Sequence, residues 1–174
     1  MRRALVLTSA SLLLGGLMLT GLTGCSSDPR DVEIKKIVAL LEEASTDVIS
    51  VADSIKSAVK KAQDDPEKKE VTEDALKPAF EAIETLKKLG GKFQYVKSRI
   101  DSIPDVPTED QKQAYVRENK ADIERNLDRL VAAQKQLETV LKDAAPYMNR
   151  DAMASLQTKL KEAEEPFLTL GQRA

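Results

Sequence analysis

The chain has 174 residues, of which 41% are hydrophobic and 32% are charged, and its formal net charge is −2. These values are typical of one globular domain, and a weakly acidic chain with mixed charges does not predict the basic face of a nucleic-acid-binding protein. With no His, no Trp and a single Cys, the sequence lacks the side chains that most often perform acid–base catalysis or bind zinc and iron–sulfur clusters.

The first 25 residues have the pattern of a bacterial secretory signal. Arg2 and Arg3 precede an apolar run that ends in Leu22-Thr23-Gly24-Cys25, in the order of the charged and hydrophobic regions of a signal peptide. Two alternatives stay open. The run is almost long enough to cross ~30 Å of hydrocarbon as an uncleaved transmembrane helix, or it is an ordinary secretory signal in which the cysteine is incidental.

The residues Leu22-Thr23-Gly24-Cys25 resemble the lipobox of bacterial lipoproteins, in which an aliphatic residue, a small residue and Gly or Ala precede an invariant Cys. The resemblance implies that residues 1–24 are a signal peptide cleaved after Gly24. It also implies that Cys25 is the acylated N-terminus of the mature protein. Residues 25–30 then form a lipidated tether, and residues 31–174 form the mature domain.

The resemblance also implies a location. Several acyl chains together hold a protein durably on a membrane. Where the usual sorting rule of lipoproteins applies, Ser26 after the acylated cysteine favours the outer membrane over the inner membrane. We therefore expect a lipid-anchored protein of the bacterial cell envelope that faces the periplasm. Its expected partners are the membrane, through the anchor, and a protein of the envelope, but no nucleic acid and no metal.

After the signal segment, the sequence predicts a long amphipathic helix. Asp28 suits the N-cap and Pro29 the first helical position, and Asp64-Asp65-Pro66 ends the helix. Its other face carries charged residues such as Lys35 and Lys56. Hydrophobic residues recur at alternating spacings of three and four, which predicts a buried seam over four heptads. The seam comprises Ile34, Ile37, Leu41, Ala44, Val48, Val51, Ile55, Ala58 and Ala62.

A second helix is predicted from Thr72 to the residues before Pro104. Pro78 cannot complete the backbone hydrogen bonds of a helix interior, so either the first turn is separate or the helix kinks there. Gly90 and Gly91 interrupt the apolar pattern, and each costs about 1 kcal/mol relative to Ala. Their expected use is close packing against a neighbouring helix, or a bend.

The sequence Thr108-Glu109-Asp110-Gln111 is a capping box, which predicts a third helix that ends at Pro146. Lys120 and Gln134 fall on its expected inward stripe, where a buried Gln usually fixes the register of a bundle. The apolar members of that stripe are Val116, Ile123, Leu127, Leu130, Leu137 and Leu141.

A fourth helix is expected to begin near Asn149, with Pro166 bending its last turn. Its apolar stripe comprises Met153, Leu156, Leu160, Ala163, Phe167 and Leu170. Four amphipathic helices joined by short polar connections predict an all-α fold, an elongated antiparallel up-down four-helix bundle. A first helix of the predicted length spans roughly 50 Å, so we expect a rod.

No catalytic, cofactor-binding or metal site is predicted, and therefore no enzyme. Carboxylates occur in adjacent pairs such as Glu42-Glu43 and Glu164-Glu165, but adjacent helical residues point to different faces. Di-iron bundles need inward-facing Glu-x-x-His motifs, and haem bundles need His as well. The serines of the first helix have no recognisable activating Lys or His.

Three classes of function stay open. The first is a non-catalytic structural or accessory subunit that docks on an envelope complex. The second is a helical bundle that binds a small apolar ligand in space left by alanines at the seam. The third is a coiled-coil lipoprotein that self-associates through the seam of its first helix. In architecture alone, a lipobox with a four-helix domain resembles the PsbQ-like lipoproteins of photosystem II and the helical pilotins of secretins, and architecture does not set function.

Overall fold

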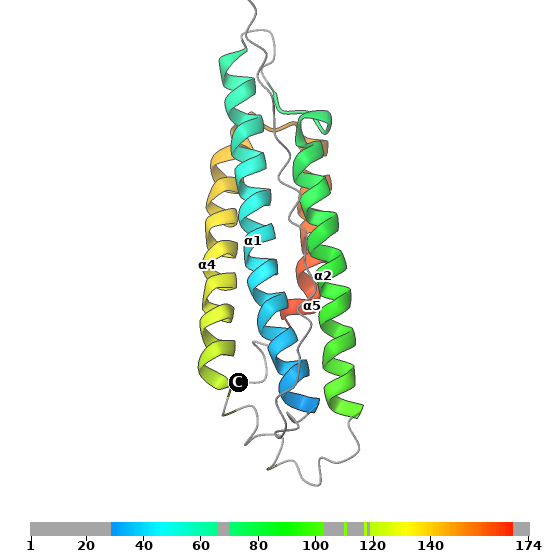
Figure 1. The fold of residues 1–174 in the computed structure, drawn as a ribbon. Coiled ribbons are helices and arrows are strands. Elements are labelled where there is room, and N and C mark those ends of the chain that lie inside the picture. Colours follow the sequence, from blue (N-terminus) through cyan, green and yellow to red (C-terminus); the bar gives the residue numbers. More distant parts are fainter. Residues whose placement is uncertain (1–28, 66–69, 103–109, 111–116, 118, 169–174) are drawn as a thin grey trace, which may run out of the picture.

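The computed structural model describes residues 29–65, 70–102, 110, 117 and 119–168. Within these residues, four α-helices form an elongated bundle (Figure 1), which confirms the predicted all-α class. Short 3-10 turns lie before the second of these helices and between the last two. The elements are α1 (Pro29–Asp64), η1 (Asp74–Leu76), α2 (Lys77–Ser102), α4 (Lys120–Ala144), η2 (Ala145–Tyr147) and α5 (Arg150–Leu168).

α1 is the helix around which the core is built. It has 36 residues, which corresponds to about 54 Å. The predicted seam is confirmed, because its members from Ile34 to Ala58 are buried and Ala62 is half-buried, while Lys35 and Lys56 are exposed. Burial of a Leu or Ile side chain contributes about 1.5–3 kcal/mol. The seam is therefore a large part of the stability of the fold.

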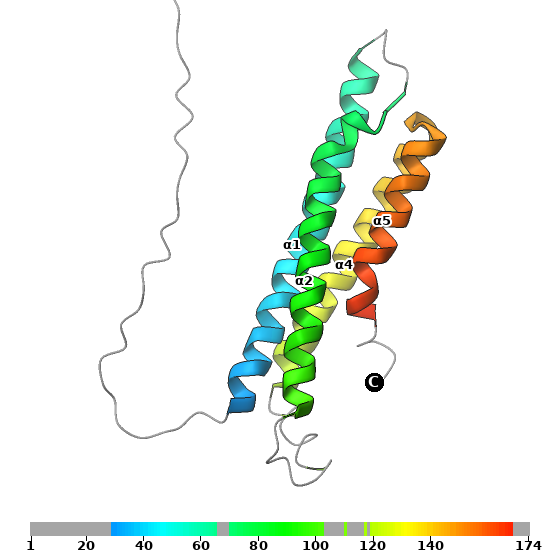
Figure 2. The same ribbon diagram turned by 90° about the vertical axis from the view of Figure 1, so that its right-hand side faces the viewer.

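The helices alternate in direction along the chain, with α1 and α4 running one way and α2 and α5 the other (Figures 1 and 2). Around the bundle their order differs from the order in the chain. α1 packs along both α2 and α4, and α2 packs along α5. Although α4 and α5 are consecutive, their described backbones do not approach each other to a comparable extent. The molecule is thus two helical hairpins side by side, with parallel contacts between them.

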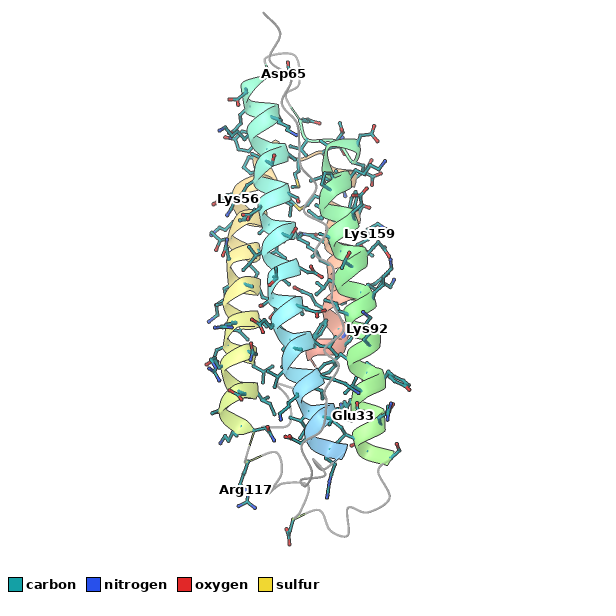
Figure 3. All side chains as sticks on the ribbon, in the orientation of Figure 1. Glu33, Lys56, Asp65, Lys92, Arg117 and Lys159 are labelled. Atoms are coloured by element: carbon teal, nitrogen blue, oxygen red, sulfur yellow. The ribbon has the colours of Figure 1, made fainter. Side chains whose placement is uncertain are left out.

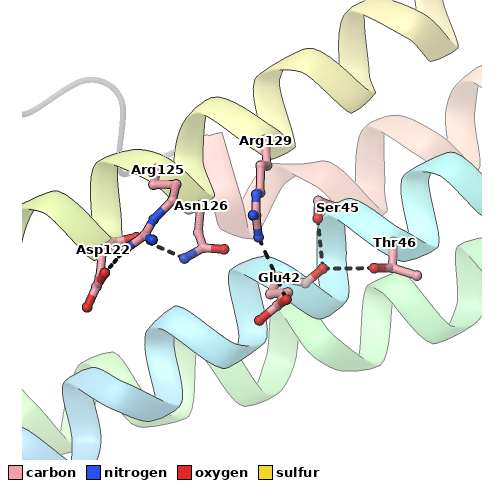
Figure 4. A network of polar contacts seen from close by, with 7 residues as sticks. All are labelled: Glu42, Ser45, Thr46, Asp122, Arg125, Asn126 and Arg129. Carbon is pink, nitrogen blue, oxygen red and sulfur yellow. Dashed lines mark hydrogen bonds and ion pairs between the residues drawn. The ribbon is translucent and has the colours of Figure 1, made fainter.

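Small and polar residues line the parallel contact between α1 and α4. Ser45 is buried on α1 and donates a hydrogen bond to the Glu42 carbonyl at 2.8 Å, and Asn126 is buried on α4. Glu42 also forms an ion pair with Arg129 of α4 at 3.7 Å (Figure 4). Short side chains allow two helix backbones to lie close together.

The α2–α5 contact also depends on a residue without a side chain. The ring of Pro166 in α5 lies against Gly90 of α2, which confirms close packing as the use of this glycine. The Gln94 amide donates a hydrogen bond to the Pro166 carbonyl at 3.0 Å, and the rings of Phe93 and Phe167 are 5.4 Å apart. Pro78 is the second residue of α2, and the separate turn η1 precedes it, so the helix does not kink there.

Two backbone hydrogen bonds tie the hairpins together at the end far from Pro29. The Val71 amide donates to the Tyr147 carbonyl at 2.7 Å, and the Asn149 amide donates to the Val71 carbonyl at 3.2 Å. The Val71 side chain is buried. The connection between α1 and α2 is thereby joined to the turn between α4 and α5.

α4 differs from its prediction in two ways. It begins at Lys120, after the turn residue Asn119, whereas the capping box at residues 108–111 falls mainly outside the described residues. Lys120 is exposed and pairs with Glu124 at 3.4 Å, so its predicted place on an inward stripe is wrong. The buried row comprises Asn126, Leu130, Ala133, Leu137, Val140 and Ala144.

Gln134 and three predicted stripe residues are only half-buried: Ile123, Leu127 and Leu141. The physical reason is that α4 packs along α1 and much less against α5, which rotates the buried row by about one residue. The fourth helix agrees with its prediction, since the Asn149 side chain accepts a hydrogen bond from the Asp151 amide at 2.8 Å just before α5 begins. Its stripe is buried at Leu156, Leu160, Ala163 and Phe167 and half-buried at Met153.

Candidate functional site

The predicted processing and acylation residues, Gly24 and Cys25, lie outside the described residues. The first helix, α1, begins at Pro29, shortly after them in the sequence. Only four residue steps separate Cys25 from the first turn of the bundle. Within the described helices, none is long and apolar enough to span a membrane.

Three serines of α1 lie along one groove. Ser50, Ser54 and Ser57 line a groove of about 510 Å³ beside the start of α2, together with Lys61. No hydrogen bond joins Lys61 to these hydroxyls in the described part of the chain. Activation of a serine requires a base within hydrogen-bond distance, and Lys61 does not supply one among the described residues.

Adjacent carboxylates diverge, as predicted for neighbours on a helix. Glu42 points toward Arg129 of α4, whereas Glu43 lines a groove between α1 and α2. Glu164 is half-buried and Glu165 is exposed. Among the described residues, no three His, Cys, Asp or Glu side chains come together as a metal site would require.

α4 and α5 pack less closely than the other neighbouring helices, and a groove of about 370 Å³ lies between them, which we call the α4–α5 groove. Its floor consists of the buried side chains of Leu137 and Leu160 and the half-buried Leu141. Its polar edges comprise Gln134, Glu138, Gln157, Lys161 and Glu164. An apolar floor with a few polar groups at its edges is typical of a binding groove.

Two carboxylates of the α4–α5 groove have no cationic partner among the described residues. Burial raises the pKa of Glu164, hydrogen bonding by the Gln134 side chain partly opposes that rise, and the nearby charge of Glu138 adds to it. A half-buried carboxylate without a counter-charge is unfavourable in its ionised form. The groove thus places two carboxylates and one cation, Lys161, beside apolar surface.

A second groove, of about 330 Å³, lies between α1 and α2 near the beginning of α1, and we call it the Glu33 groove. Glu33 is only 4% exposed. One of its carboxylate oxygens lies 2.9 Å from Lys36 Nζ and 3.4 Å from an Arg99 guanidinium nitrogen. Its other oxygen is buried without a hydrogen-bond partner. A buried carboxylate therefore holds two cations at the surface of this groove.

The sequence pattern did not predict the buried polar residues. Glu33 precedes the seam residue Ile34 and has the charge of a surface residue, yet it is buried beside its ion-pair partners Lys36 and Arg99. Asn126 lies four residues before Leu130, a member of the predicted stripe, and helical spacing therefore places the two residues on adjoining parts of one face. Gln134, which was expected to be the buried amide, is half-buried at the edge of the α4–α5 groove.

Comparison with known proteins yields no relative. No protein family profile, no curated protein sequence and no solved structure matches this chain.

Proposed function

We propose that this protein is a non-catalytic, lipid-anchored lipoprotein of the bacterial cell envelope that binds a protein partner as a structural or accessory subunit. The anchor rests on the lipobox, Leu22-Thr23-Gly24-Cys25. The observation that carries the binding role is the α4–α5 groove, with its apolar floor and unpaired carboxylates. Its location is the periplasmic side of a membrane, with the outer membrane favoured by Ser26.

The chemistry of the groove defines the partner. Leu137, Leu141 and Leu160 offer apolar contact along a helical pair, and an amphipathic helix is a segment that buries such a stripe. Glu138 and Glu164 lie beside that floor, and a Lys or Arg on the incoming helix would supply the missing counter-charge. The expected partner surface is therefore an amphipathic helix with cationic side chains beside its apolar ridge.

A photo-crosslinking amino acid at Gln157 tests this proposal in the cells that make the protein. Gln157 lines the α4–α5 groove, whereas Thr85 is exposed on α2 and serves as the control position. We expect a discrete protein crosslink from position 157 that is absent from position 85. Mass spectrometry of the crosslinked peptide should identify an amphipathic segment that contains Lys or Arg.

Two outcomes contradict the proposal. Equal crosslinking from both positions, or none from position 157, would remove the groove as a partner surface. A crosslink from position 157 to a small molecule instead would support the second candidate function, a bundle that binds a small apolar ligand, which the leucine floor favours. The third candidate needs the seam of α1, and that seam is buried within the bundle.

A further inference from the structure

The Glu33 groove has a different character from the α4–α5 groove. Its rim carries three cations, Lys36 from α1 and Lys92 and Arg99 from α2. The opposing acidic groups are Glu43 and the buried Glu33. Figure 3 labels Glu33 near the beginning of α1 and Lys92 on α2. The exposed rim of the groove is therefore mainly cationic, because one of its two carboxylates, Glu33, is buried.

The buried carboxylate positions the cations. Glu33 has a side chain that is 6% exposed, whereas those of Lys36 and Arg99 are 48% and 53% exposed. Both cationic groups are thus held by Glu33 while remaining accessible to solvent. Lys92 is exposed and forms no ion pair with another described residue. Positively charged groups that converge on a groove in this way recognise a phosphate.

Exposed apolar side chains lie beside these cations. Tyr95 is 62% exposed, and the Arg99 guanidinium lies 6.0 Å from the centroid of its ring. Val32, which is 43% exposed, is one turn before Lys36 on the same face of α1. An exposed Tyr and an aliphatic side chain flanked by Lys and Arg are typical of a surface that contacts the interfacial region of a bilayer.

The groove also lies at the end of the bundle that follows Cys25. The four residue steps from Cys25 to Pro29 can span at most roughly 14 Å. Lys36 is about 10 Å further along the axis of α1. An acyl chain on Cys25 would therefore hold this end of the bundle close to lipid head groups.

We propose that the Glu33 groove binds the phosphates of anionic phospholipids and lays the α1–α2 face of the bundle on the membrane. This inference rests on the proposed anchor at Cys25. Because the α4–α5 hairpin lies on the other side of the bundle from α1 and α2 (Figure 2), the α4–α5 groove then faces away from the bilayer. Membrane contact and partner binding thus use opposite faces.

The absence of Trp from the chain allows a direct test. A Tyr95→Trp variant of the mature acylated protein, reconstituted into vesicles, has one Trp in the groove, and a Tyr147→Trp variant has one at the other end of the bundle. In vesicles of equal parts phosphatidylglycerol and phosphatidylcholine, we expect a blue-shifted emission from position 95 and quenching by brominated lipids. Position 147 should show neither change, and high salt should reverse both at position 95.

A charge reversal identifies the groove as the cause. In the Tyr95→Trp protein, Lys92→Glu should reduce blue shift and quenching to their values in phosphatidylcholine vesicles. The same charge change at the exposed Lys142 of α4 should leave both signals intact. Equal emission in the two kinds of vesicle, or no effect of Lys92→Glu, would overturn the proposal. Flotation of the same samples reports the anchor separately, since an acylated protein floats with phosphatidylcholine vesicles whatever the groove does.

Discussion

The ring of Pro166 packs directly on the backbone of Gly90. A Cβ atom built on Gly90 would lie 2.7 Å from Pro166 Cγ, whereas one built on the next residue, Gly91, would have no neighbour within 4 Å. The proline ring is rigid, and the Gln94 side chain donates a hydrogen bond to the Pro166 carbonyl at 3.0 Å, so the ring cannot move aside cheaply. The distance between α2 and α5 therefore depends on Gly90 and not on Gly91.

Gly90 and Gly91 should respond in opposite directions to the same substitution. Gly90→Ala forces the two helices apart, and overpacking of this kind costs about 1–3 kcal/mol. Gly91→Ala gains helix propensity without a clash and should stabilise the protein by about 0.5–1 kcal/mol. Urea unfolding of both variants measures the difference. Equal effects would show that α2 and α5 do not approach as closely as observed.

Truncation of the buried seam should be far more costly than truncation of the exposed face of α1. Leu41 is fully buried, and Leu41→Ala should lower the free energy of unfolding by about 2–5 kcal/mol. Lys35→Ala, at an exposed position, should change it by no more than about 0.5 kcal/mol. Thermal unfolding followed by circular dichroism measures both. A stable Leu41→Ala protein would contradict the inward-facing seam.

Ionisation of one carboxyl group of α1, that of Asp47, should make the bundle less stable as the pH rises. Burial and the nearby charge of Glu43 raise the pKa of Asp47, and one carboxylate oxygen of Asp47 is buried without a partner. The folded state then holds this proton more tightly than the unfolded state, whose pKa is about 3.9. Stability is thus lost as pH rises from that value through the raised pKa of the folded state.

Asp47→Asn should therefore raise the melting temperature at neutral pH and leave it nearly unchanged below about pH 4. The control is Asp53→Asn, because Asp53 is exposed and pairs with Lys56 at 3.3 Å. A surface pair of this kind contributes about 0–1 kcal/mol. If Asp47→Asn destabilises the protein at neutral pH, then the carboxylate has a partner in solution that the structure lacks.

Cys25→Ser tests the anchor independently of the bundle. The change should abolish incorporation of labelled fatty acid and leave the protein at the size of the unprocessed precursor, since the cysteine thiol is the acylated group of a lipobox. Metabolic labelling followed by gel electrophoresis measures both. Continued acylation, or processing to the mature size, would rule out lipoprotein maturation at this position.

Local sequence determined the helices themselves. Spacings of three and four define the buried seam of α1 from Ile34 to Ala58, since a helix brings such residues to one face whatever lies beyond it. Some helix ends are set by residues that act equally locally. Asn149 before α5 is an example, because its side chain bonds an amide only two residues away.

Only the tertiary structure decided which faces meet. The spacing of apolar residues predicts which face of a helix is buried, but it does not predict which helix packs on that face. The parallel pairing of α1 with α4 could therefore not be predicted from it. That pairing turns Asn126 inward and leaves Gln134 at the edge of the α4–α5 groove. Likewise, the sequence does not distinguish Gly90 from Gly91, although only Gly90 meets Pro166. The ion pair of Glu33 with Arg99, 66 positions later, exists only across the α1–α2 contact. Such choices depend on contacts between residues far apart in the chain, and those exist only once the helices have packed.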